Sequence, residues 1–314
     1  MSLARTFLRR ARAAQREHLM PAAMHNLGSV QLARGEFKSA EATLAAALVL
    51  KKASSGASAN VASCLNDLGI SRKQLGKLRA AETCFSEALA IYADVFGDGP
   101  SNAFAALPAA ARADVACTRI NLGNVYMSVG NTVDAEACYV CALEAFRAIH
   151  GPGARNADVA KALGNLGVVR DARGEYAAAV RHHALALDMQ LAVYGPDAVN
   201  AELANSRENL GNALSHRGGD GDLARAEAEL LACLAMRHAL SAGQDYPLVR
   251  TLAKLGDVAS KLRADDAACA RYASALRILE TMQPTDPLVA HKKKAIGASL
   301  AEVFARVAPA PAGG

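Results

Sequence analysis

The apolar residues of the chain recur as a paired motif at a long and nearly constant interval. A leucine followed by a glycine recurs at six regularly spaced positions, and the intervals between successive glycines of this series are 41, 54, 44, 44 and 45 residues. The pairs are Leu27-Gly28, Leu68-Gly69, Leu122-Gly123, Leu166-Gly167, Leu210-Gly211 and Leu255-Gly256. Self-similarity at a fixed period is the sequence signature of a repeat protein. The pattern therefore predicts six copies of one structural unit.

Two further positions of the unit indicate a pair of antiparallel helices. A second glycine follows the first by seven residues in five copies, and Arg263 takes its place in the sixth. Glycine adopts the left-handed conformation that ends a helix at no steric cost, so it would stop the first helix there. Where the two helices cross, we expect the Leu-Gly glycine to face an alanine, which lets the backbones approach closely. These alanines are Ala40, Ala81, Ala135, Ala179, Ala226 and Ala268.

Composition favours helices throughout. Apolar residues make up 52% of the 314 residues, aromatic residues only 4%, and tryptophan is absent, so segments typical of strands are scarce. An Ala-Leu or Cys-Leu pair late in each second helix would pack on the next copy. We therefore expect an all-α, right-handed superhelical solenoid of hairpins over residues 21–283, with an insertion near 98–112. A capping helix would follow at 284–308, and a flexible tail at 309–314.

The first twenty residues carry most of the net charge. The chain has a formal charge of +5, and Arg5, Arg9, Arg12 and Arg16 form one stripe at helical spacing. Residues 1–20 are therefore either a half-repeat that caps the array or a basic targeting segment of the mitochondrial transit type. A stripe of this kind can also bind an acidic surface. The remainder is close to neutral, which argues against a nucleic-acid groove.

The segments NLGNVYMSVGN from Asn121 and YGPDAVNAELANSRENLGNALSHRGG from Tyr194 show the repeat most clearly, and Leu-Gly-Asn occurs at residues 122–124 and 210–212. Over residues 21–283 the pattern resembles the lengthened tetratricopeptide repeat of kinesin light chains and of the Leu-Gly-Asn adaptors that orient mitotic spindles. It departs from the shorter repeat in lacking a proline at the end of the second helix. The resemblance implies a scaffold that binds proteins, and in both families matching asparagines contact the bound peptide.

Asparagine recurs on the predicted first helices, directly before the Leu-Gly pair and one turn to either side. Because first helices line the concave face of such an array, these side chains would form a peptide-binding groove. An amide both donates and accepts, so a column of amides can hold a peptide backbone. Alternatively, the amides tie neighbouring helices together. The candidate residues are Asn121, Asn124, Lys161, Asn165, Asn205, Asn209 and Asn212.

Other residue pairs that suggest chemistry have simpler explanations. Cys138 and Cys141 lie within one predicted helix with no second pair, whereas zinc needs about four converging ligands. His182 and His183 are adjacent and therefore diverge by about 100° on a helix. The sequence contains no glycine-rich phosphate loop or nucleophile elbow, so we expect no enzyme activity, metal or cofactor.

Three classes of function remain. The leading hypothesis is a scaffold or adaptor that binds a peptide segment of a partner protein in the concave groove. The second is a structural subunit of a cytoskeletal, ciliary or mitochondrial assembly, which would use the convex face and the insertion. Helical-repeat RNA binding is the third, and the near-neutral body argues against it. With seven scattered cysteines and no span of about 20 apolar residues, we expect a cytoplasmic or cytoskeleton-associated protein, or alternatively a mitochondrial one.

Overall fold

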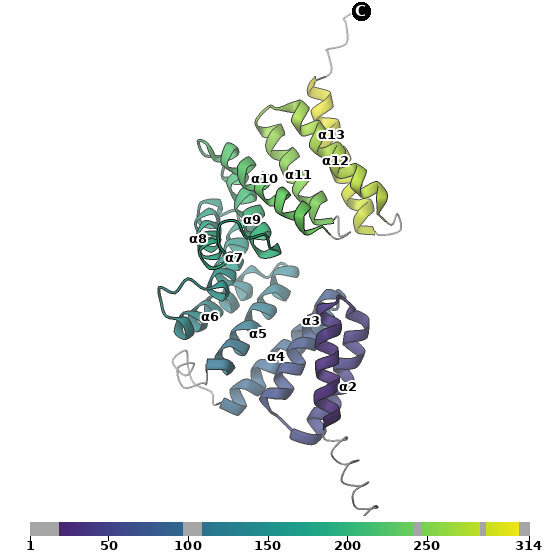
Figure 1. Cartoon of the computed structure of the whole chain (residues 1–314), viewed down its shortest axis with the longest axis vertical. Coiled ribbons are helices and arrows are strands. Elements are labelled where there is room, and N and C mark those ends of the chain that lie inside the picture. The colour runs from purple at the N-terminus through teal and green to yellow at the C-terminus, as the bar shows by residue number, and fades with distance from the viewer. Residues whose placement is uncertain (1–18, 97–108, 242–245, 283–286, 308–314) are drawn as a thin grey trace, which may run out of the picture. The chain divides into compact units, whose positions relative to one another are not determined.

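The computed structural model describes residues 19–96, 109–241, 246–282 and 287–307 (Figure 1). All regular secondary structure in these ranges is helical, as the composition predicted. The predictions for residues 1–18, for 97–108 within the insertion, and for the tail fall outside the described residues. The chain divides into two compact units, residues 1–154 and 155–314.

The first unit consists of three consecutive helical hairpins. In each, a first helix packs against the second helix that follows it, and the second helices of the first two hairpins also pack against the first helix of the next. The helices are residues 19–33, α2 (Phe37–Ser55), α3 (Ala59–Gln74), α4 (Leu78–Phe96), α5 (Ala109–Ser128) and α6 (Thr132–His150).

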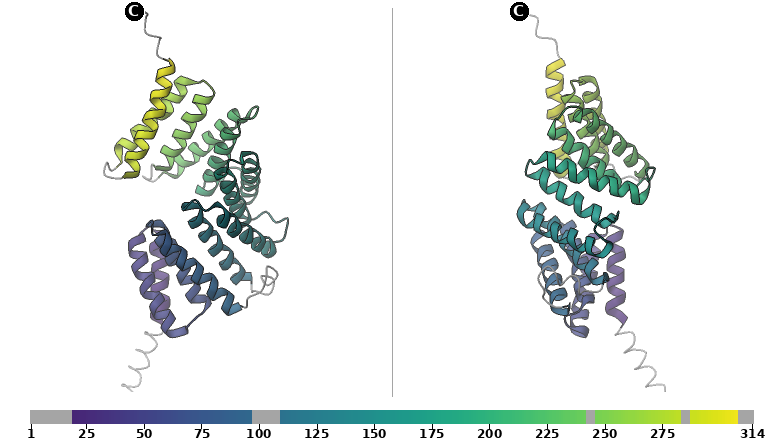
Figure 2. Two further views of the ribbon diagram at one scale, coloured as in Figure 1. Left: turned by 180° about the vertical axis from the view of Figure 1, so that it is seen from behind. Right: turned by 90° about the vertical axis from the view of Figure 1, so that its left-hand side faces the viewer.

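The second unit repeats this arrangement three times and ends with one additional helix (Figure 2). Its last helix, α13, packs mainly on α12 and also contacts α11. The helices are α7 (Ala157–Ala172), α8 (Tyr176–Tyr194), α9 (Ala201–Arg217), α10 (Asp222–Leu240), α11 (Tyr246–Lys261), α12 (Asp265–Thr281) and α13 (Pro287–Val307).

The glycines predicted to stop the first helices have the left-handed conformation. Their φ angles are 74° at Gly35, Gly76 and Gly174, 79° at Gly130 and 63° at Gly218. Longer second helices end in a similar way, at Gly151 and Gly195, where φ is 97° and 94°. Gly97 and Gly243, which follow two other second helices in the sequence, lie outside the described residues. Glycine spacing therefore marks the end of the first helix in five of the six hairpins.

The Leu-Gly glycine lies under a large side chain of the second helix. A Cβ atom on Gly69 would be 2.6 Å from the ring of Phe85, and one on Gly256 would be 2.5 Å from the ring of Tyr272. Each of the six glycines has such a partner, 16 residues later in five hairpins and 19 residues later in the fifth. The predicted alanines are all fully buried. The closest contact is nevertheless with the large side chain, which corrects the expected glycine-to-alanine contact.

Helix α13 closes the apolar core of the second unit. Val289, Ile296 and Val303 are buried, and Leu300 packs against the same core. Val307 continues the same apolar spacing, yet it is half exposed at 51%. The helix spans the residues predicted from its apolar spacing. It also places a row of polar side chains beside α11, where the candidate site lies.

Candidate functional site

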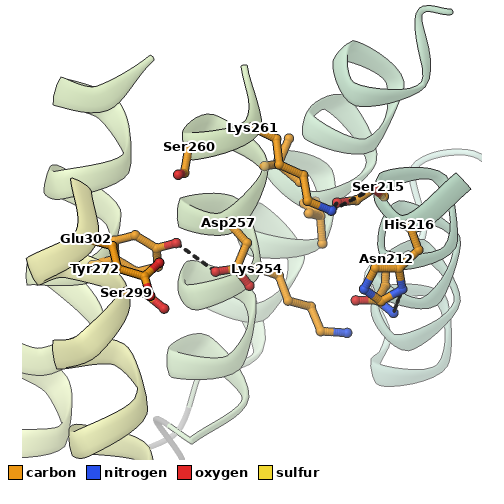
Figure 3. Close-up of a pocket in the computed structure, with 12 residues that line it drawn as sticks. Asn212, Ser215, His216, Lys254, Asp257, Ser260, Lys261, Tyr272, Ser299 and Glu302 are labelled. Carbon is orange, nitrogen blue, oxygen red and sulfur yellow. Dashed lines mark hydrogen bonds between the residues drawn. The ribbon is translucent and has the colours of Figure 1, made fainter. Parts of the chain in front are cut away.

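Two cavities of about 270 and 240 Å³ lie on the surface formed by α9, α11 and α13 of the second unit. Figure 3 shows the first of them, with side chains from these helices directed into one space. Both cavities are lined by the same group of five residues: Asn212, Lys254, Asp257, Tyr272 and Ser299. We call these five residues the shared lining. All five side chains carry a group that can form a hydrogen bond, so the surface suits hydrogen bonding to a ligand.

Asn212 lines both cavities, and its own hairpin has no tyrosine hydroxyl opposite its amide. In the third hairpin the Tyr139 hydroxyl donates to Asn124 Oδ1 at 2.8 Å, and in the sixth the Tyr272 hydroxyl donates to Asp257 Oδ1 at 2.7 Å. The fifth hairpin has Leu230 at the position of these tyrosines. The Asn212 amide instead lies 3.4 Å from His216 Nδ1, a long contact that a stronger acceptor would displace.

A buried carboxylate holds three cations beside the shared lining. Glu208 on α9 has a side chain only 1% exposed. Its Oε1 lies 2.6 Å from Arg250 Nε and 3.2 Å from Lys254 Nζ, and its Oε2 lies 2.5 Å from Arg237 Nη2. The Thr251 hydroxyl also donates to Oε2 at 3.2 Å. Because so many donors converge on one carboxylate, this cluster joins α9, α10 and α11 and fixes the direction of Lys254 and Arg250.

The two cavities differ in charge. The 240 Å³ cavity is lined by Arg250, Lys254 and Lys292 against a single carboxylate, Asp257. In the 270 Å³ cavity, by contrast, two lysines face two carboxylates, and one of those lysines donates to the Ser215 carbonyl at 2.8 Å. Burial lowers the pKa of Lys254, and the charge of Arg250 lowers it further while Glu208 opposes both. The lining of the smaller cavity thus has three cationic side chains and one carboxylate, and the lowered pKa of Lys254 weakens proton binding at one of the three.

In the first unit, the predicted asparagines hydrogen-bond within the chain. Asn121 Nδ2 donates to Asn66 Oδ1 at 3.0 Å, which links α5 to α3. Asn124 accepts from Tyr139, as described above. Both contacts correspond to the alternative in which the amides tie helices together. The nitrogen of Asn121 and the oxygen of Asn124 are therefore both engaged within the chain.

In the second unit, the predicted residues lie in different surroundings. Asn205 accepts from Arg237 Nη2 at 3.0 Å and lines a third cavity, of about 360 Å³, beside the start of α9 and α11. Asn165 and Asn209 are half-buried, and Asn165 Nδ2 is enclosed without a hydrogen-bond partner among the described residues. Lys161 is exposed. Of the seven predicted residues, Asn212 is the one that belongs to the shared lining.

Sequence reasoning missed most of the shared lining and the charged cluster. Asp257 is at the repeat position of Asn212, and Lys254 at that of Asn209, each 45 residues later. Taking the residues at these repeat positions in the sixth hairpin, whatever their type, would have found Asp257 and Lys254. Ser299 and Arg237 follow no repeat position, since α13 is outside the repeat and Arg237 comes from a second helix. Their roles require the three-dimensional packing.

The residue pairs that suggested other chemistry are structural. The Cys138 thiol, on α6, has its pKa raised to about 11 by burial, which leaves it protonated and a poor metal ligand. His183 is buried over Gly167, and its Nε2 lies 3.0 Å from Asp171 Oδ2. His182 Nδ1 lies 2.9 Å from the Ala178 carbonyl. Among the described residues, no group of three or more His, Cys, Asp or Glu side chains is arranged to hold a metal ion.

None of the helices in the described part of the chain combines the length and the apolar character that a membrane span requires.

Residues 19–94 and 114–192 match the tetratricopeptide repeat family. Together with the hairpins described above, the match confirms that the chain is built from tetratricopeptide repeats. The chain has no sequence match among curated proteins. Tetratricopeptide repeats mediate protein–protein interactions and the assembly of complexes, and scaffolds of this family are generally non-enzymatic.

Solved structures with the same fold include kinesin-light-chain-like repeat proteins. BtubC (BKLC) from P. vanneervenii has a TM-score of 0.57 and 22% identity over 76% of this chain and 89% of its own. Kinesin light chain nearly identical TPR-like repeats from Podospora anserina give a TM-score of 0.51 and 14% identity, over 72% of this chain and 98% of theirs. These structures share the helical-repeat fold of this chain.

A larger relative in structure is a chain of the APC/C hetero-tetramer Cut9-Hcn1, with a TM-score of 0.61 and 15% identity. The match covers 93% of this chain and 46% of that one. This chain therefore spans slightly less than half the length of that relative. At these identities the likeness concerns the fold.

Proposed function

We propose that this chain is a protein-interaction scaffold that binds a peptide segment of a partner on the surface of α9, α11 and α13. The observation that carries the proposal is the shared lining, in which side chains from four helices, α9, α11, α12 and α13, line two adjoining cavities. An extended peptide presents backbone donors and acceptors at regular intervals. Asn212 and Ser299 provide both kinds of group, and Lys254 and Asp257 add charges of opposite sign.

The position of the surface in the repeat supports this proposal. Helices α9 and α11 are first helices of their hairpins, and first helices form the binding face of helical-repeat scaffolds. The cluster around Glu208 keeps Lys254 in a fixed direction, so less side-chain entropy is lost on binding. The apolar core beneath, including Val258 and Leu230, is closely packed and leaves the cavities on a rigid base.

An amide comparison tests the proposal. Asn212→Ala should weaken binding of a captured partner segment several-fold, the value of one lost hydrogen bond, without changing the unfolding midpoint. Asn124→Ala is the matched control because it removes the same side chain from the same repeat position. It should instead lower stability by about 1 kcal/mol, since it leaves the Tyr139 hydroxyl without its acceptor. Equal affinity of wild type and Asn212→Ala, measured by fluorescence anisotropy, would contradict the proposed site.

The alternative role as a structural subunit makes a different prediction. A subunit held in an assembly through other surfaces would keep its partners when the shared lining is altered. Partner capture with variants of this surface therefore separates the two functions.

A further inference from the structure

We propose that the 240 Å³ cavity is a subsite for a phosphorylated serine or threonine of the partner segment, with Lys292, Lys254 and Arg250 as its ligands. The inference rests on the proposed function and specifies the partner that the same surface would recognise. It is carried by an imbalance of charge in the cavity lining, where three cationic side chains, Arg250, Lys254 and Lys292, meet one carboxylate, Asp257. The buried Glu208 is shared with Arg237, which lines neither of the two cavities.

The buried part of this cluster cannot compensate its own charge. Glu208 is one carboxylate with one negative charge, and its two oxygens already contact three cationic groups. Asp257 accepts from the Tyr272 hydroxyl, which orients that carboxylate toward α12 (Figure 3). Concentrating positive charge in a partly desolvated site is unfavourable unless an anion enters. A ligand carrying negative charge would therefore gain from the whole cluster.

The size of the excess positive charge indicates which anion fits the cavity. The excess amounts to two positive charges, and a phosphorylated hydroxyl carries about −1.5 to −2 at pH 7, whereas a carboxylate carries −1. Arginine and lysine together form the usual pocket for a phosphoryl group, because the guanidinium donates two parallel hydrogen bonds and the ammonium adds a point charge. A cavity of about 240 Å³ has room for several water molecules, which a tetrahedral phosphoryl group would displace.

The remainder of the cavity indicates what accompanies the phosphate. Val249 and Ile296 are buried in its floor, and Tyr246 and Ala253 also line it. An apolar residue next to the phosphorylated one would cover this floor while the phosphoryl group reaches the cations. The partner is thus expected to present a phosphorylated residue beside an apolar side chain.

Binding of the full-length chain to peptide arrays tests this subsite directly. The probe is a random peptide library with a central phosphoserine, compared with otherwise identical libraries that have serine or glutamate at that position. Library members carrying phosphoserine should bind at least tenfold more tightly than their serine counterparts, measured by fluorescence anisotropy on the best binders, and inorganic phosphate should compete. Replacing Lys292 by glutamine (Lys292→Gln) should remove roughly tenfold of this affinity while leaving serine peptides unaffected.

Lys294→Gln is the matched control, because it removes the same charge from the same helix at a residue that lines neither cavity. It should leave phosphopeptide affinity unchanged. Lys254→Gln is a second test of the subsite, and Glu208 keeps two cationic partners in that variant.

Four results would overturn the inference. Equal binding of phosphoserine and serine peptides, both sensitive to Asn212→Ala, would leave the proposed peptide surface intact and remove the phosphate subsite. Glutamate peptides binding as tightly as phosphoserine peptides would make the site one for ordinary acidic segments. Equal losses in Lys292→Gln and Lys294→Gln would show general electrostatic attraction instead of a site. An array without any binder would also overturn the subsite, and partner capture would then decide the proposed function separately.

Discussion

Arg263 has the same backbone conformation as Gly218, its counterpart one repeat earlier. Their φ angles are 60° and 63°, and Arg263 is the one non-glycine residue with positive φ in the described part of the chain. Five hairpins end their first helix with glycine at this position, and the sixth keeps the geometry without it. The turn is therefore dictated by the packing of the hairpin, and arginine adopts a conformation that is strained for a residue with a Cβ atom.

Relieving this strain should stabilise the sixth hairpin. Arg263→Gly removes the left-handed penalty, partly offset by the greater freedom of glycine in the unfolded chain, for a net gain of about 0.5–1 kcal/mol. Gly218→Ala, the reciprocal change at the matched position, should cost about 1 kcal/mol. Urea unfolding followed by circular dichroism measures both. A lower midpoint for Arg263→Gly would show that the arginine side chain contributes more than its backbone costs.

The glycine of the Leu-Gly pair should tolerate no side chain. Gly256→Ala would place a Cβ atom 2.5 Å from the Tyr272 ring, which cannot turn away freely because its hydroxyl is bonded to Asp257. Overpacking of this kind costs about 1–3 kcal/mol. Gly297→Ala on α13 is the control, since a Cβ atom there meets nothing within 4 Å and alanine favours the helix. The control should unfold at the same or a higher urea concentration, and an equal midpoint for Gly256→Ala would refute the contact.

Asp222 should make stability depend on acid pH. It accepts from Arg217 Nε at 2.7 Å, from Arg217 Nη2 at 2.6 Å and from the Gly219 amide at 2.8 Å. These bonds, the Arg217 bond first, hold the pKa of this carboxyl below its ordinary value of 3.8, with burial opposing. A depressed folded-state pKa means that the contribution is present above pH 3.8 and is lost as pH falls through the folded value.

Asp222→Asn should accordingly lower stability by about 1 kcal/mol at pH 7, discounted because Arg217 is partly solvated. The difference from wild type should shrink as the pH falls through the folded-state pKa of Asp222, below which both side chains are uncharged. Thermal unfolding at a series of pH values checks this. A stability difference between wild type and Asp222→Asn that stays constant from pH 7 to pH 3 would show that the effect does not come from the charge of the carboxylate.

The fold was predictable because the same sequence pattern of helix residues and helix ends occurs in six copies. Glycines such as Gly130 and Gly174 mark where first helices end, and the spacing of Val289, Ile296 and Val303 marks the last helix. The partner of each Leu-Gly glycine was not predictable. Leu44, Phe85, Tyr139 and His183 fill that place in the first four hairpins, and leucine and tyrosine recur in the last two, so the side chain must be large but its type is not fixed.

The candidate site was less predictable than the fold. Asn212 was found because it belongs to the repeating column, yet its availability depends on Leu230 replacing a tyrosine in the opposite helix. The cluster around Glu208 draws cations from residues 29 to 46 positions later in the chain, on two other helices. Sequence spacing does not predict this contact, because the contact arises from the packing of one hairpin on the next.

The most direct test of the scaffold proposal is partner capture from native cell extract with the shared lining filled. Ser299→Trp places a large side chain at a residue that lines both cavities, and Ala298→Trp places the same side chain one residue earlier, where it is exposed and lines neither. Circular dichroism melts of both variants establish that they fold. Bound proteins are then quantified by mass spectrometry. The account predicts that one set of partners is lost with Ser299→Trp and retained with wild type and Ala298→Trp, and identical partners for all three proteins would contradict it.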